Sequence, residues 1–251
     1  MKALEYHAII IIANSYKHNG RCVAGIDLSQ DGFPLVRPVS SNDAGQLPVH
    51  DIAPEGLDSL PVFKTVLVPL TRSTPESYQS ENWEVVEGAS WIEANSPQIM
   101  HELILKVANR QANLWTKDDP KSEVGANYNS WNAQRDRLPF DEANQLQSSL
   151  ALIKLDSMRI DRWKNLDTGE IEQFRGNFKY DNRYFNLKIT DPKVEALWES
   201  LPTPKTRRPH EDSPHIEPRH VNNILTTISL GVPFHGYVYR LIANIQRFSI
   251  N

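Results

Sequence analysis

The single cysteine of the chain, Cys22, follows His18 by four positions in the segment NSYKHNGRCVAGIDL. A thiol beside an imidazole is a pairing used in nucleophilic catalysis, provided that the thiol is exposed and the base lies within hydrogen-bond reach. The alternation in RCVAGIDL argues against this role, because it places Cys22 on the same strand face as apolar residues. We therefore expect Cys22 to pack in a core, as unpaired cysteines commonly do.

The polar residues of the same segment are better suited to holding an anion. We expect Asn14 to Arg21 to form a loop between two strands, in which Gly20 permits a positive φ angle and exposes backbone amides. Arg37, on the next strand, has the opposite parity to its apolar neighbours and would face the same groove. The candidate ligand-binding residues of this region are Tyr16, Lys17, His18, Arg21 and Arg37. The alternative is an ordinary polar hairpin loop.

A second set lies on a predicted hairpin, where strands at 171–180 and 183–190 are joined by Asp181 and Asn182. Alternation gives each strand an apolar face, expected to point into a barrel, and a polar face without an acid. Cations neutralise phosphates and a tyrosine ring can stack on a base, so the polar face fits a nucleic acid. Its residues are Arg175, Asn177, Lys179, Tyr184, Asn186 and Lys188, flanked by Arg162, Lys164 and His235 in loops. The alternative is a solvated strand face.

Two further groupings have weaker chemical signatures. His210, His215 and His220 recur in a tract whose prolines exclude the helical spacing of many metal sites, so we expect a plain loop. The segment YQSENW, residues 78–83, offers Trp83 either for base stacking or, as the favoured interpretation, for closing a barrel. The sequence has no P-loop, nucleophile elbow or paired-cysteine zinc motif. We therefore predict no catalytic residue, no metal ligand and no cofactor.

The elements that must position these residues are mainly strands. Five β segments are expected in the first half: residues 6–13, 21–28, 34–39, 62–72 and 82–93. A helix capped by Ser96 follows, and then a polar connection with a short helix at 140–147. The second half has a long strand at 149–163, whose apolar parity changes midway as at a bulge. The hairpin, a helix capped by Asp191, and strands at 223–230 and 236–248 complete it.

The elements predicted for the second half follow the order strand, strand, strand, helix, strand, strand. This order is the connectivity of an OB-fold, a five-stranded, partly open barrel. The first half offers as many strands, with its helix displaced. We therefore predict a mainly β protein made of two OB-fold-like five-stranded barrels with a few short helices. The expected divisions are an N-terminal barrel at 1–95, a helix and long polar connection at 96–148, and a C-terminal OB-fold at 149–251.

Five segments of the chain resemble the dual OB-containing domain family: NSYKHNGRCVAG, PLVRPVS, YQSENW, NFKYDNRYFNLKITDP and TISLGVPFHGYVYRLIA. The resemblance covers most of the chain and is weakest between residues 95 and 148. It implies two fused OB-folds in prokaryotic proteins, often discussed beside defence or mobile-element genes. It also implies that the ligand is a nucleic acid or a nucleotide.

The composition limits the classes of partner. With a net charge of −4, the whole molecule has no generic attraction for polyanions, so any nucleic-acid contact must come from a local basic patch. The longest apolar run, AIIIIA, is too short to cross a bilayer, and one cysteine fits a reducing cytoplasm. We therefore expect a cytoplasmic module that binds single-stranded DNA or RNA, or a nucleotide, without membrane contact. The alternatives are a protein-docking component of a larger assembly and, third, a metal-dependent nucleic-acid hydrolase.

Overall fold

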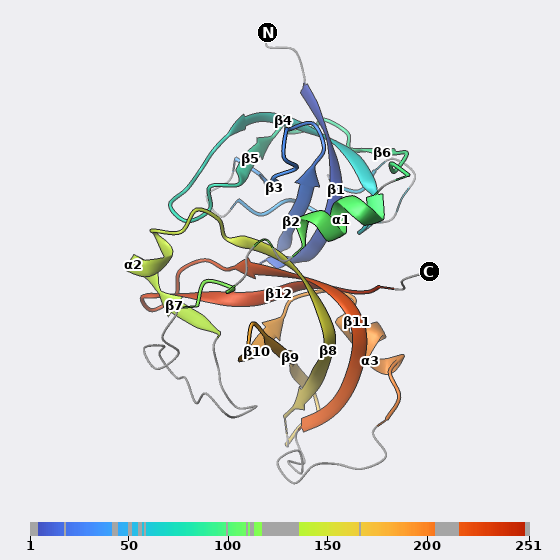
Figure 1. The fold of residues 1–251 in the computed structure, drawn as a ribbon, viewed down its shortest axis with the longest axis vertical. Coiled ribbons are helices and arrows are strands. Elements are labelled where there is room, and N and C mark those ends of the chain that lie inside the picture. Colours follow the sequence, from blue (N-terminus) through green and yellow to red (C-terminus); the bar gives the residue numbers. More distant parts are fainter. Residues whose placement is uncertain are drawn as a thin grey trace. The chain divides into compact units, whose positions relative to one another are not determined.

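The computed structural model describes residues 5–17, 19–41, 45–49, 52–54, 57, 59–98, 100–108, 110, 113–116, 136–165, 167–203 and 216–248. The chain divides into two compact units (Figure 1). Unit 1 comprises Met1–Asn109 and Asn144–Leu152, and unit 2 comprises Arg110–Ala143 and Ile153–Asn251. Strands account for 54% and helices for 9% of the structure described, and each unit contains a closed five-stranded barrel, which confirms the predicted fold class.

The barrel of unit 1 has the strand order β1-β2-β3-β5-β4 and is closed by pairing of β1 with β4. Its strands are β1 Glu5–Lys17, β2 Gly20–Asp27, β3 Leu35–Val39, β4 Thr65–Ser73 and β5 Asn82–Val85. Only β3 and β5 are paired in parallel within this barrel. Strand β6 Ile92–Ala94 adds to β4, and helix α1 Met100–Val107 follows it, so the helix is displaced from its usual place between the third and fourth strands.

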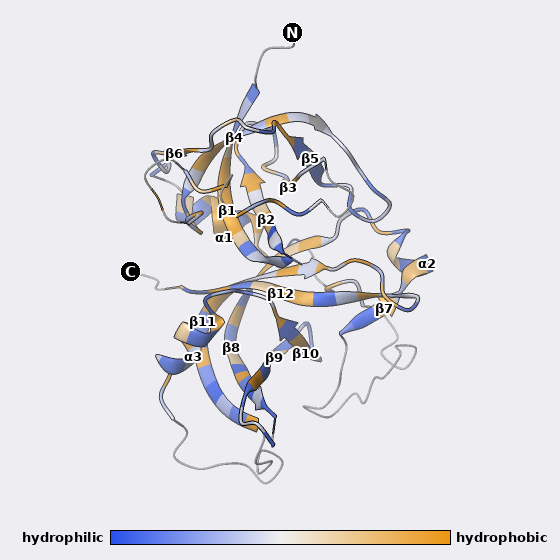
Figure 2. Ribbon diagram, turned by 180° about the vertical axis from the view of Figure 1, so that it is seen from behind, coloured by the Kyte–Doolittle hydropathy of each residue, from blue (hydrophilic) through white to orange (hydrophobic). Residues whose placement is uncertain are grey.

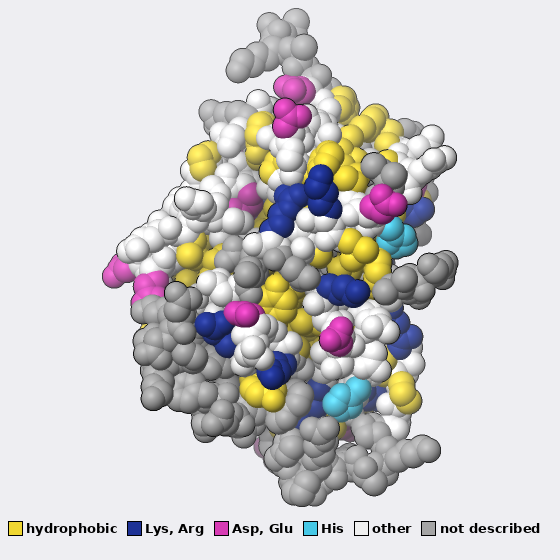
Figure 3. Space-filling model, in the orientation of Figure 1, with side chains coloured by type: hydrophobic (Ala, Val, Ile, Leu, Met, Phe, Trp, Pro, Cys, Tyr) yellow, Lys and Arg dark blue, Asp and Glu magenta, His cyan; other side chains and the backbone are white. Residues whose placement is uncertain are grey.

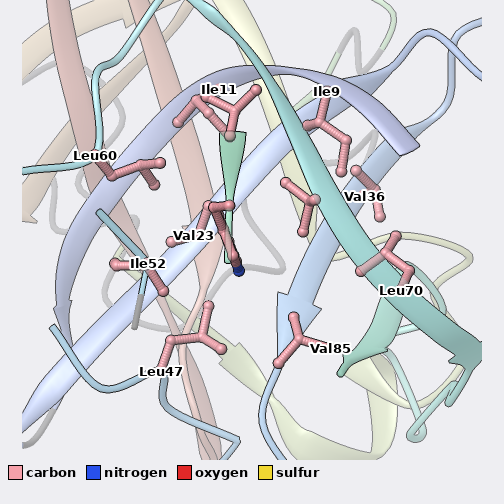
Figure 4. Packing of buried hydrophobic residues seen from close by; sticks show 12 residues of the cluster. Ile9, Ile11, Val23, Val36, Leu47, Ile52, Leu60, Leu70 and Val85 are labelled. Atoms are coloured by element: carbon pink, nitrogen blue, oxygen red, sulfur yellow. The ribbon is translucent and has the colours of Figure 1, made fainter. Parts of the chain in front are cut away.

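The core of unit 1 is a cluster of branched apolar side chains, of which Figure 4 shows twelve. Ile9 and Ile11 from β1, Val23 from β2 and Val36 from β3 are at most 1% exposed. Each such side chain stabilises the fold by roughly 1.5–3 kcal/mol when fully buried. Trp83 of β5 packs against the cluster and is partly buried, which agrees with its predicted role in closing the barrel.

The barrel of unit 2 repeats this topology in the order β8-β9-β10-β12-β11, with β8 next to β11 and β10 parallel to β12. Its strands are β8 Leu150–Lys164, β9 Ile171–Tyr180, β10 Arg183–Ile189, β11 Ile216–Leu230 and β12 Tyr237–Arg247. Helix α3 Val194–Glu199 lies between the third and fourth strands, as predicted. Strand β7 Arg137–Pro139 extends the sheet beside β12, and α2 Phe140–Ala143 follows it.

Strand β8 changes the face on which its apolar side chains lie. Leu155 is buried, Asp156 and Ser157 are both exposed, and Met158 is buried again. Because side chains alternate along a strand, two consecutive exposed residues reverse the parity, which confirms the predicted switch. The residues after the switch therefore present odd-numbered side chains to the outside of the barrel.

Both predicted helix caps have other roles in the structure. The Oγ of Ser96 accepts a hydrogen bond from Thr65 N at 3.2 Å, whereas α1 begins only at Met100. Asp191 accepts from Lys193 N at 2.9 Å and, through its other carboxylate oxygen, from Ile245 N at 3.0 Å. Asp191 therefore ties the entry of α3 to β12 instead of occupying the N-cap position.

The polar connection contains more ordered structure than its sequence predicts. Leu114 and Trp115 are buried, and their carbonyl oxygens each accept a hydrogen bond of 2.8 Å from the Arg240 guanidinium on β12. Both residues have positive φ angles, of 49° and 59°. Residues in this conformation lie outside regular helices and strands, so no hydrophobic periodicity marks them in the sequence. The described part of the connection therefore belongs to unit 2, and the short helix predicted at 140–147 is present only as α2, Phe140–Ala143.

Candidate nucleic-acid interface

The hairpin of β9 and β10 carries its predicted ligand-binding residues on one side. Its cross-strand pairs are Lys179 with Tyr184, Asn177 with Asn186, and Arg175 with Lys188. Directly opposite residues of an antiparallel pair point to the same side of a sheet, so these six share a face. The other face holds the side chains of Phe174, Phe178, Phe185, Leu187 and Ile189, all buried. The predicted division into an apolar inside and a polar outside is therefore confirmed.

Strand β8 extends this surface with two residues that were not predicted. Arg159 pairs with Asn177 across the strands, and Asp161 pairs with Arg175. The eight residues together are named the polar face here: Arg159, Asp161, Arg175, Asn177, Lys179, Tyr184, Asn186 and Lys188. The prediction that this surface lacks an acid holds for the hairpin but not for β8. The parity switch in β8 was the signal that could have placed both residues on the outside.

The middle of the polar face is tightly hydrogen-bonded. Asp161 Oδ2 accepts from Arg159 Nη2 and from Asn177 Nδ2, both at 2.8 Å. All three side chains are buried, so Asp161 balances the charge of Arg159 and fixes the amide of Asn177. Asn177 Oδ1 has no hydrogen-bond partner among the described residues. A buried acceptor of this kind is usually satisfied by a protein group or an ordered water.

Arg175 is held by residues on both sides of it. Its Nε donates to Asn186 Oδ1, its Nη2 donates to the Asn186 carbonyl oxygen at 2.6 Å, and the same Nη2 lies 3.3 Å from Asp136 Oδ2. The side chain is 13% exposed. Arg175 is therefore oriented by its neighbours, and its charge is partly offset by Asp136.

The exposed charge of the polar face belongs to Lys179 and Lys188. The Nζ of Lys179 lies 5.9 Å from the centre of the Tyr184 ring. Lys179 also lines a hollow of about 400 Å³, within the roughly 300–1,000 Å³ typical of small-molecule pockets. Its wall includes Lys154, Asp156, Arg159, Asn177, Lys179, Asp181 and His220. The wall of the hollow therefore combines cationic side chains with two carboxylates and Asn177.

The predicted anion-binding loop of unit 1 is mostly strand. Strand β1 continues to Lys17 and β2 starts at Gly20, so only two residues separate the strands. Gly20 does not have a positive φ angle, but a Cβ there would lie 2.6 Å from the Leu47 carbonyl oxygen. The backbone N–H and C=O of Arg21 both hydrogen-bond to Leu47 at 2.9 Å. This amide is therefore occupied within the protein and does not cradle an anion.

The side chains predicted for ligand binding in unit 1 differ in how far they are exposed to solvent. Tyr16 is 58% exposed, with the Arg21 guanidinium 4.4 Å from its ring centre. Lys17 is half-buried, and burial, together with the nearby Arg37 charge, lowers the pKa of its amine. His18 lies outside the described residues.

Arg37 is buried in an ion pair instead of lining a groove as predicted. It is 1% exposed, with its Nη2 3.5 Å from Glu81 Oε1, and its backbone N donates to the Glu81 carbonyl oxygen at 2.8 Å. Glu81 in turn accepts hydrogen bonds from the backbone N and the Oγ of Ser149. Tyr78 is also buried, and this burial raises the pKa of its phenol to about 12. These groups form an internal polar cluster of unit 1.

Cys22 is half-buried and is not part of the core cluster, to which β2 contributes Val23. The prediction of a core position failed because Ala24 and Ile26, on the same face as Cys22, are buried as well. When both faces of a strand are covered, apolar alternation cannot identify the core-facing side.

The flanking residues predicted for unit 2 do not extend the polar face. Arg162 and Lys164 both form ion pairs with Glu217, and the Arg162 guanidinium lies 3.7 Å from the ring centre of Trp198 on α3. They therefore hold α3 against β11. His235 is exposed in the turn between β11 and β12.

The surface of the protein carries charged side chains of both signs. In the view of Figure 3, Lys and Arg form small groups with Asp and Glu between them, and no continuous basic surface. Among the described residues, no group of three or more His, Cys, Asp or Glu side chains could hold a metal ion. His210 and His215 lie outside those residues, whereas His220 lies on β11. None of the helices in the described part of the chain is long and apolar enough to span a membrane.

Comparison with protein families gives one match that covers both barrels. A family model described as the dual OB-containing domain matches residues 7–245. Comparisons with curated proteins and with solved structures gave no match.

Proposed function

Because the chain belongs to the dual OB-containing domain family, we propose that it binds single-stranded nucleic acid on the polar face of unit 2. The outer surface of the second and third strands is the usual ligand surface of an OB-fold, and these strands are β9 and β10 here. The observation that carries the proposal is the shared face of Lys179, Tyr184 and Lys188, of which Lys179 also lines the hollow. A net charge of −4 makes a local group of exposed lysines informative.

The residue types on this face match the parts of a nucleic-acid strand. The exposed lysines, Lys179 and Lys188, would neutralise phosphates, and the Tyr184 ring would stack on a base. Asn177 lies in the wall of the hollow, where Asp161 holds its amide. Its fixed position in the network around Asp161 lowers the cost of ordering it on binding.

Fluorescence anisotropy of a labelled single-stranded oligonucleotide, titrated at several salt concentrations, tests this proposal. Affinity should fall steeply with salt, and Lys179→Ala combined with Lys188→Ala should reduce the slope of log K against log salt by about 1.4, at roughly 0.7 per phosphate contact. Lys193→Ala, at an exposed lysine of the same unit, is the matched control and should bind as the wild type does. Absence of binding at low salt, or a double variant with an unchanged slope, would overturn the proposal.

A protein-docking role is the second candidate function. It is favoured by Val232 and Phe234, which are 46% and 60% exposed in the turn between β11 and β12. A pull-down from extract with nuclease treatment separates the candidates: partners that survive nuclease, without copurified nucleic acid, support docking. The main proposal also includes a prokaryotic defence or mobile-element setting. This part rests on family likeness alone. The third function predicted from sequence, a metal-dependent hydrolase, would show as oligonucleotide cleavage that a chelator abolishes.

A further inference from the structure

The outward surface of unit 2 continues from the polar face onto β12 and β7. Lys188 of β10 pairs in parallel with Leu241 of β12, so the outward parity of β12 includes Leu241, Tyr239 and Tyr237. Val238, of the other parity, is fully buried. Tyr239 pairs with Arg137 of β7, which therefore lies on the same outward side.

Specific contacts join the two parts of this surface. Asp136, which pairs with Arg175 of the polar face, is followed directly by Arg137. The Arg137 guanidinium lies 5.0 Å from the ring centre of Tyr237, and its hydrogen bond with Tyr239 raises its pKa. The polar face thus leads through Asp136 to a cation surrounded by aromatic rings.

The turn after β11 adds an exposed ring at the end of this path. Phe234 is 60% exposed, although exposing a side chain of this size forfeits roughly 1.5–3 kcal/mol of burial. The backbones of Phe234 and Tyr237 exchange hydrogen bonds of 2.8 and 3.1 Å across the turn. The His235 ring stands edge-on to Phe234, with centroids 4.1 Å apart. Phe234, Tyr237, Tyr239 and Arg137 are named the aromatic strip here.

We propose that unit 2 binds an oligonucleotide across both surfaces, with phosphates on the polar face and bases stacked on the aromatic strip, and not a mononucleotide. Lys179 and Arg175 lie four residues apart on β9, a span of roughly 13 Å at about 3.3 Å per residue. Two further strand spacings of about 4.8 Å each lead from β9 across β10 to β12. A single nucleotide cannot reach both ends, whereas an OB-fold commonly holds about 4 or more nucleotides. This inference rests on the proposed function and specifies its ligand.

Competition against a labelled octanucleotide by unlabelled strands of increasing length provides the first test. A nucleoside monophosphate and a dinucleotide should compete at least tenfold more weakly than a tetranucleotide, because they cover only one of the two surfaces. Equal competition by the monophosphate and the octanucleotide would overturn the inference. The proposed function would survive that result if binding still depended on Lys179 and Lys188.

Substitution of the exposed ring provides the second test. Phe234→Ala should weaken octanucleotide binding about tenfold, as expected for loss of one stacked base, and leave dinucleotide binding at the polar face unchanged. Phe234→Trp should retain the octanucleotide affinity. Val232→Ala, in the same turn, is the matched control for the loss of an exposed apolar side chain. An unchanged affinity in Phe234→Ala would contradict the inference, and failure of every strand to bind the wild type would overturn the proposed function with it.

Discussion

The two barrels have the same strand topology, but the outer surface of the second and third strands is mainly apolar in unit 1 and polar in unit 2. The middle of the second strand is a core-facing glycine in both, Gly25 in β2 and Gly176 in β9. Gly25 lies opposite Ile11 and Val36, and Gly176 lies opposite Ile160 and Leu187. These registers align the strands residue by residue. The alignment is supported by the third and fifth strands, since Arg37 pairs in parallel with Asn82 just as Lys188 does with Leu241.

Most of the aligned outward positions differ in chemistry, although Arg37 and Lys188 are both cations. Ile10, Ile26 and Leu35 of unit 1 correspond to Arg159, Asn177 and Asn186 of unit 2, and Ala24 corresponds to Arg175. Ile10, Ala24 and Ile26 are at most 2% exposed. Figure 2 accordingly shows β1 and β2 mainly in the colour of hydrophobic residues.

One topology therefore supports two uses of the same surface. In unit 1 the outer face of the second and third strands is mainly apolar, and Ala24, Ile26 and Arg37 on it are buried, which suits structural packing. In unit 2 it is polar, with exposed lysines and a hollow. Function follows from the side chains placed on the barrel and not from the barrel itself.

Arg37 and Lys188 occupy aligned positions, so the largest expected difference is between their alanine variants. Arg37→Ala should destabilise the protein by about 3–5 kcal/mol, because it leaves Glu81 buried without its charge partner. Lys188→Ala should change the free energy of unfolding by less than about 0.5 kcal/mol. Urea denaturation followed by tryptophan fluorescence measures both.

A second variant separates charge pairing from packing at Arg37. Arg37→Met combined with Glu81→Gln removes both charges and should recover part of the stability that Arg37→Ala loses. If Arg37→Ala and Lys188→Ala proved equally mild, Arg37 would not have the structural role that distinguishes unit 1 from unit 2.

The two aligned glycines give a smaller contrast in stability. An added Cβ at Gly25 would lie 2.1 Å from Ile9 Cγ2 and 3.0 Å from the Ile10 carbonyl oxygen, neither of which can move easily. At Gly176 it would meet Ile242 Cδ1 at 2.4 Å, the far end of a flexible side chain, and Met158 Sδ at 2.8 Å, in the adaptable thioether of another. Gly25→Ala should therefore cost about 3 kcal/mol and Gly176→Ala about 1 kcal/mol, measured by urea denaturation. The reverse order would show that the core of unit 2 is the less adaptable one.

Local patterns in the sequence were sufficient to predict the strands and the division of the hairpin. The turn at Asp181 and Asn182 was predicted as a two-residue connection, and both residues have positive φ angles, of 45° and 58°. Apolar alternation then assigned Phe178 and Phe185 to the inside of the barrel. These features depend on neighbouring residues, which is why a pattern could reveal them.

Features that depend on distant parts of the chain could not be predicted in this way. The burial of Arg37 depends on Glu81 and Ser149, which are remote in sequence. The aromatic strip becomes visible only through the parallel pairing of β10 with β12. Periodicity shows which side chains share a face of one strand, but it does not show which strand comes next to it.

Helix α3 is a further difference between the units, because the described residues between β3 and β4 of unit 1 include no equivalent helix. The smallest expected effect concerns the ion pairs that hold this helix. Burial alone would raise the pKa of Glu217, but hydrogen bonds from Lys164 and Arg162 outweigh it and lower the pKa below the usual 4.5. The ion pairs therefore stabilise unit 2 above pH 4.5, and this stability is lost as the pH falls through the lowered pKa.

Glu217→Gln should reduce this loss of stability at acid pH, by less than about 1 kcal/mol because the site is partly exposed. Glu199→Gln, at the 56% exposed second partner of Arg162, is the control and should have less effect, as unfolding measurements on both sides of pH 4.5 would show. An equal effect of the two variants would mean that Glu217 has no special part in holding α3 to the barrel.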